Sequence, residues 1–63
     1  MKKAKVIVKG LEPRFFEDEV YEVTKEFRAV DLFDPEGKEA DFVLIKNELG
    51  LEQELHADSV EFV

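Results

Sequence analysis

The stretch from Asp34 to Gly50, DPEGKEADFVLIKNELG, decides the fold because it places a strand between two turn signals. In each signal an Asx residue is followed by glycine three positions later: Asp34 precedes Gly37, and Asn47 precedes Gly50. An Asx side chain can bond the backbone of a type I turn, and glycine readily takes the positive φ that closes a hairpin loop. The stretch therefore predicts two consecutive β-hairpins that share a central strand.

The strands on either side follow from hydrophobic alternation. The central strand at 41–46 is apolar on both faces, which is typical of the middle of a strongly curved sheet or barrel. In the next strand Leu51 and Leu55 alternate with charged residues, so the leucines are expected to face the core. The predicted antiparallel strands are 3–9, 28–33, 39–46, 51–56 and 60–63.

The segment from Pro13 to Phe33 has two interpretations. Its apolar residues from Phe16 to Val30 are spaced four, three, four and three apart, as on one face of an amphipathic helix. Residues 20–24, VYEVT, are instead rich in β-branched and aromatic side chains, which favour a strand. We expect residues 20–27 to be extended, and the alternative is an α+β fold of βαββ order with a helix at about 14–31.

Length and composition predict one small domain spanning 1–63. With 63 residues, 44% of them hydrophobic, the chain has room for one core, and dimerisation could supplement its stability, so we expect a monomer or a homodimer. The absence of cysteine excludes disulfides and thiolate metal sites and fits a reducing compartment, so a cytoplasmic location is expected. The apolar run Val6–Val8 is too short for a secretory signal or a membrane span.

The charge is strongly negative and unevenly distributed. Residues 1–9 carry four lysines and no acid, whereas residues 10–63 carry all sixteen acids against five bases, and the net charge is −7. A protein partner with a basic surface is therefore expected, rather than nucleic acid bound directly. The lysines are interpreted as internal neutralisers, with Lys3 or Lys5 across from Glu61 on neighbouring strands.

No constellation of residues predicts catalysis, a metal or a cofactor. His56, Asp58 and Ser59 are too close together in the chain to form a triad in which the base lies between nucleophile and acid. Placing Gly37 at the sixth position of a calcium loop puts Leu32 at the first and Val43 at the twelfth, where oxygen ligands are required. We therefore expect no enzyme activity.

Four stretches resemble small SH3-like barrel proteins of bacteriophage genomes. They are Phe15–Phe16 with its acidic loop, Val20–Val23, Asp41–Asn47 with Gly50, and His56–Val63. The resemblance implies an all-β, SH3-like five-stranded small barrel with a 3₁₀ turn at Ala57–Ser59, used as an interaction module, such as a phage-encoded inhibitor or modulator of a host protein. The chain has no tryptophan and departs from the SH3 domains that bind proline-rich peptides.

The predicted function is that of a small acidic protein-interaction module without catalytic activity. An acidic loop beside an exposed aromatic side chain is typical of a hot spot aimed at a basic surface. Phe15 is the candidate anchor, although most of Phe15, Phe16 and Phe33 are expected in the core. The candidate contact acids are Glu17, Asp18 and Glu19, then Asp31, Asp34 and Glu36. The alternatives are a nucleic-acid-mimicking inhibitor of a DNA-binding protein and a structural or assembly component.

Overall fold

Both predicted turns form as their sequences indicate in the computed structural model, which describes all of residues 1–63. Gly37 and Gly50 have φ values of 66° and 82°. The Gly37 N–H donates to the Asp34 carbonyl at 3.0 Å, and the Gly50 N–H donates to the Asn47 carbonyl at 3.0 Å. The Asx side chains accept further backbone N–H groups inside their loops, Asp34 from Glu36 and Asn47 from Leu49 and Leu51. Turn chemistry thus sets the meander.

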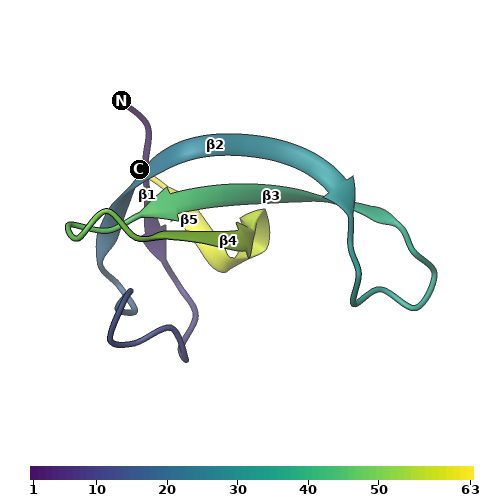
Figure 1. The fold of residues 1–63 in the computed structure, drawn as a ribbon, viewed down its shortest axis with the longest axis horizontal. Coiled ribbons are helices and arrows are strands. Elements are labelled where there is room, and N and C mark those ends of the chain that lie inside the picture. Colours follow the sequence, from purple (N-terminus) through teal and green to yellow (C-terminus); the bar gives the residue numbers. More distant parts are fainter.

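Five antiparallel strands make one sheet in the order β4-β3-β2-β1-β5, with no α-helix (Figure 1). The elements are β1 (Lys3–Val6), β2 (Val20–Val30), β3 (Glu39–Lys46), β4 (Glu52–His56), the 3₁₀ helix η1 (Ala57–Ser59) and β5 (Val60–Phe62). The extended prediction for residues 20–27 is confirmed, and the helix at about 14–31 is wrong. The strand predicted at 28–33 is the end of β2, which stops at Val30. The structure contains no helix with the length and hydrophobicity that crossing a membrane requires.

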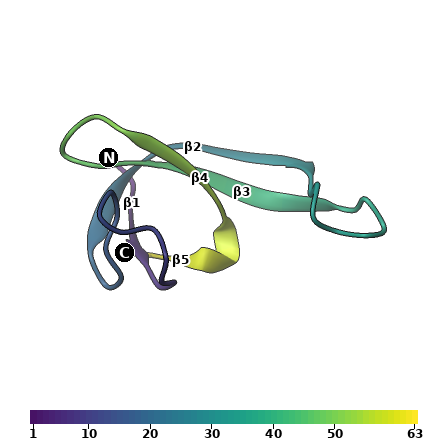
Figure 2. The same cartoon turned by 60° about the horizontal axis from the view of Figure 1, so that its bottom comes forward.

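The all-β prediction is confirmed, but the strongly curved sheet does not close into the expected five-stranded barrel. Its two edges are β4 and β5, which η1 joins end to end without a ladder between them. Figure 2 shows the sheet curling so that β1 and β5 lie beneath β4. β5 has three residues and pairs with β1 along one edge, and no ladder joins its other edge to β4.

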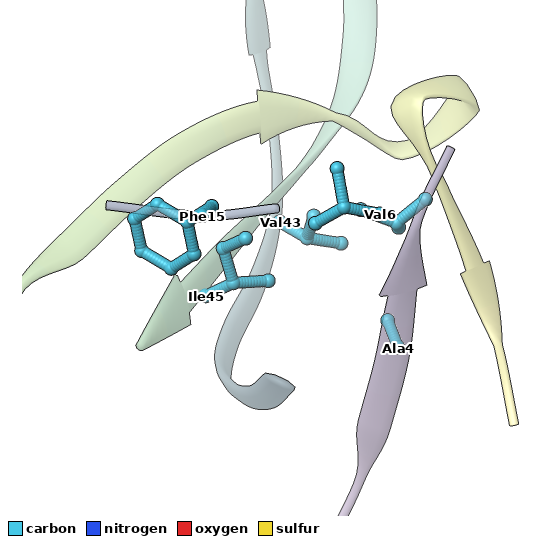
Figure 3. Packing of buried hydrophobic residues seen from close by; sticks show 6 residues of the cluster. Ala4, Val6, Phe15, Val43 and Ile45 are labelled. Carbon is cyan, nitrogen blue, oxygen red and sulfur yellow. The ribbon is translucent and has the colours of Figure 1, made fainter. Parts of the chain in front are cut away.

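The core lies inside this curl and is small. Ala4 and Val6 alternate inward from β1, Val43 and Ile45 from β3, and Val60 and Phe15 complete the cluster of buried side chains. Figure 3 shows the Phe15 ring beside Ile45, with Val6 and Val43 on the other side. None of the buried residues is polar or charged.

One of the four lysines in the basic amino terminus forms an ion pair within the protein. Lys5 lies opposite Glu61 in the β1–β5 register, which confirms the predicted placement, although no ion pair joins the two. The ion pair is formed by Lys2, whose Nζ lies 2.9 Å from Glu26 Oε2. The same ammonium group lies 4.5 Å from the centre of the Phe62 ring.

The outer part of the β2–β3 hairpin extends beyond the core. β1 pairs with β2 only as far as Glu22, and β4 pairs with β3 only from Phe42 onward. Residues 26–42, which we call the arm, therefore project from the curled sheet and form a two-stranded ribbon beyond the Phe42–His56 pair (Figures 1 and 2). The arm ends in a loop at 31–38, the arm loop.

Candidate functional site

The acidic loop at Glu17–Glu19 is exposed, but its predicted aromatic anchor is not. Phe15 is 1% exposed, so its proposed role as a contact residue is wrong. The loop turns back on itself there, with the Phe15 N–H donating to the Leu11 carbonyl at 3.2 Å, and this turn carries the ring into the core. Asp18 has a positive φ of 69°, and its N–H donates to the Val6 carbonyl at 2.7 Å, which holds the loop against β1.

Phe16, which is 50% exposed, takes the surface position beside this loop. It lines a cleft of about 570 Å³ between the acidic loop and the turn at 47–50. The Asn47 side chain bridges the two by donating to the Arg14 carbonyl at 2.9 Å. The charged residues lining the cleft are Lys3, Arg14, Lys46, Glu19, Glu22 and Glu48. Three bases offset three acids, so this cleft has no charge preference of its own.

A second cleft, of about 240 Å³, lies at the base of the arm loop. Its apolar walls come from the arm and from β4, and its charged groups are acids with no lysine or arginine among them. The lining residues are Val30, Asp31, Leu32, Phe33, Phe42, Glu54, Leu55, His56 and Ser59. We call this the arm cleft, and its composition favours a cationic, partly apolar ligand.

The arm loop presents two large apolar side chains to solvent. Leu32 is 90% exposed and Phe33 is 93% exposed. The backbone that carries them is held in place, because the Phe33 N–H donates to Asp31 Oδ1 at 2.9 Å and the Asp34 N–H donates to the Asp31 carbonyl at 3.1 Å. The Asp31 N–H in turn donates to the Lys38 carbonyl at 2.9 Å and closes the loop.

Four carboxylates surround this apolar pair, and two of them have no ion-pair partner. Asp34 and Glu54 form no ion pair, and Glu36 is paired with the exposed Lys38 at 2.8 Å. Asp31 Oδ2 lies 3.2 Å from His56 Nε2. The structure therefore brings Asp31, Asp34 and Glu36 together with Leu32 and Phe33. It leaves Glu17–Glu19 at the opposite end of the molecule (Figure 1).

Sequence reasoning missed Leu32 and assigned Phe33 to the core. The signal that could have identified them is their position: two consecutive apolar residues enclosed by the overlapping turns that begin at Asp31 and Asp34. Side chains inside such a short loop have no strand partner to pack against. An apolar pair in that place is presented outward.

His56 takes part in this surface rather than in a triad. Its ring packs on Phe42, with 4.7 Å between ring centres, and its nitrogen contacts Asp31 rather than Asp58. No three His, Cys, Asp or Glu side chains gather closely enough to hold a metal ion. No protein-family model, curated protein or solved structure matches the chain, so the arm cleft is interpreted from its own geometry.

Proposed function

We propose that this protein is an acidic interaction module that binds a basic protein surface through the arm loop and the arm cleft. The observation that carries the proposal is the pair Leu32 and Phe33, about nine-tenths exposed on a hydrogen-bonded loop rimmed by Asp31, Asp34 and Glu54. Large apolar side chains at the centre of a polar rim are the usual composition of a binding hot spot.

The loop's internal hydrogen bonds make it a favourable binding element. Binding through a mobile loop costs ordering entropy, whereas a loop already held in place loses less. Burying a leucine or phenylalanine side chain contributes about 1.5–3 kcal/mol. Leu32 and Phe33 together can therefore supply much of the free energy of a moderate interaction, while the surrounding carboxylates supply orientation and a faster approach.

The strand layout supports an SH3-like assignment for the module. A meander of three strands, a short 3₁₀ link and a last strand paired with the first follow the order of that fold. The module is proposed to act inside the cytoplasm, where a chain without cysteine is at no disadvantage. A phage protein that modulates a host target is the setting that the sequence resemblance implies.

Binding of a labelled peptide in which lysine alternates with leucine tests this function by fluorescence anisotropy. The native protein should bind this peptide more tightly than it binds a control peptide of equal charge in which serine replaces leucine. The affinity should fall as the salt concentration rises. Replacing both Leu32 and Phe33 by serine should weaken binding at least about tenfold, or roughly 1.4 kcal/mol.

Two matched controls locate the effect. Leu49→Ser removes an apolar side chain that is 82% exposed on the opposite turn, and it should leave binding unchanged. Glu54→Gln should weaken binding and reduce its salt dependence, whereas Glu48→Gln, which makes the same charge change in the larger cleft, should not. Equal losses in the paired variants would show that net charge alone attracts the peptide.

A further inference from the structure

The outer edge of β2 has no strand beside it along the arm. β1 pairs with β2 from Val20 to Glu22, and one more bond joins the Val23 N–H to the Lys2 carbonyl at 2.9 Å. From residue 26 to residue 30, β2 has a neighbour only on the β3 side. Figure 1 shows this stretch as the upper border of the sheet. An unpaired edge of this kind is a template for another strand.

The backbone groups that face this open edge follow from the ladder. The Asp31 N–H donates to the Lys38 carbonyl at the end of the β2–β3 pair. In an antiparallel ladder the direction of bonding alternates from residue to residue. The odd-numbered residues of this stretch therefore bond to β3, and residues 26, 28 and 30 direct their N–H and C=O groups outward.

The charged side chains along this edge are complementary to those of a second copy of the same edge. If a second β2 lies antiparallel with the twofold axis at Phe27, Glu26 of each copy stands opposite Arg28 of the other. If the axis passed through Arg28, the two arginines would face each other, and like charges directly opposite are destabilising. Either position of the axis lets the outward N–H and C=O groups of the two copies form hydrogen bonds. The side-chain charges therefore decide between the two positions, and they favour the axis at Phe27.

The apolar face agrees with the same register. Residues 27 of the two copies form a non-hydrogen-bonded pair, in which opposite side chains come closest. Phe27 already stacks on Phe42 with 5.6 Å between ring centres, and Phe42 packs on His56. The twofold axis would continue this aromatic row across both copies. A two-stranded ribbon is marginal on its own, and pairing converts two arms into one four-stranded sheet.

We propose that the protein forms a twofold dimer through its β2 edges, with Glu26 of each copy paired with Arg28 of the other. The proposal does not depend on binding to a basic partner. The dimer uses the open edge of β2 around Phe27, whereas most of the arm-cleft lining comes from the arm loop, β3 and β4, with Val30 the one β2 residue in it. Arg28 already contacts Asp41 and Glu39 at 3.1 and 3.3 Å, and Glu26 already contacts Lys2 at 2.9 Å, so the pairs between copies would join existing ion pairs.

Charge reversal at the two positions tests the dimer by sedimentation velocity. Native protein should self-associate as its concentration rises. Glu26→Lys alone and Arg28→Glu alone should each remain monomeric, because each homodimer would contain two repulsive pairs. An equimolar mixture of the two variants should associate again, since both cross-strand pairs are then of opposite sign.

Bulk charge predicts a different outcome. Glu26→Lys changes the net charge from −7 to −5, whereas Arg28→Glu changes it from −7 to −9. If overall repulsion alone controlled association, Glu26→Lys by itself would associate best. That result overturns the proposal, as does native protein that stays monomeric at every concentration, or a mixture that stays monomeric where native protein associates.

A cysteine pair keeps the test valid if a charge variant fails to fold. The chain has no native cysteine. Phe27→Cys should form a disulfide-linked dimer on oxidation, because residues 27 lie directly opposite each other, about 4.5–5.5 Å apart. Ala29→Cys faces the same side, but its two copies lie four residues apart along the strands, about 13 Å, which is beyond disulfide reach. Equal cross-linking of both variants would refute the register.

Discussion

Replacement of Phe15 by alanine is expected to cost most of the protein's stability. The Phe15 ring is buried against Ile45, and its edge packs on Tyr21 with 4.9 Å between ring centres. Truncating a buried phenylalanine costs about 3–5 kcal/mol. At about 0.05–0.15 kcal/mol per residue, a domain of 63 residues has a free energy of unfolding of roughly 3–9 kcal/mol. The free energy lost on truncation is therefore comparable to the total free energy of unfolding.

Phe16 provides the matched control one position along the chain. Its side chain is half exposed, and its two backbone hydrogen bonds survive truncation: the Phe16 N–H donates to the Tyr21 hydroxyl at 2.7 Å, and the Glu19 N–H donates to the Phe16 carbonyl at 3.2 Å. Phe16→Ala should cost less than about 1.5 kcal/mol, half or less of a full burial.

Urea denaturation followed by tyrosine fluorescence measures both variants. Tyr21 is the only tyrosine and the chain has no tryptophan, so the signal comes from the ring that contacts Phe15. Phe15→Leu should recover part of the stability because it restores most of the lost volume. The reasoning is refuted if Phe15→Ala unfolds at nearly the native urea concentration while Phe16→Ala is the more destabilised.

Four other substitutions, at three positions, test the turn at 47–50 and the basic terminus in the same denaturation assay. Asn47→Ala should cost about 1–3 kcal/mol, because its side chain accepts two N–H groups of the turn and bonds the preceding loop; a native midpoint would exclude that role. Gly50→Val should cost about 1 kcal/mol or more. This cost comes from the positive φ and not from a clash, because an added Cβ meets no atom within 4 Å. Gly50→Asn should cost less than the valine variant, because asparagine tolerates that φ better. Lys5→Glu should cost about 0.2–1 kcal/mol by facing Glu61 with a like charge, and an increase in stability would contradict the register.

The parts of the fold that sequence predicted are those fixed by local chemistry. The two Asx–glycine turns and the strand at 39–46 each depend on residues adjacent in the chain, whereas the 3₁₀ segment at 57–59 was implied by the resemblance. Closure of the sheet depends on whether its two distant edges meet, and no local pattern encodes that. The same limit applies to Phe15 and Phe16, because the path of the loop over the core decides which of the two neighbours is buried.

The candidate site could be predicted from the sequence only in part, because some of its features depend on the tertiary fold. Its acids Asp31, Asp34 and Glu36 were visible as a charged hairpin. Leu32 and Phe33 have the composition of core residues, so their exposure could not be inferred from hydrophobicity alone. The contribution of His56 and Glu54 required the β3–β4 register, which places β4 beside the arm.

A map of amide chemical shifts during titration with the lysine–leucine peptide tests the central claim most directly. The largest changes should occur at Leu32, Phe33, Glu54 and His56, the residues of the arm loop and arm cleft. Residues that line the larger cleft, such as Arg14, Phe16, Glu48 and Leu49, should change little. Changes concentrated in the larger cleft, or spread evenly over all the acidic residues, would contradict the account.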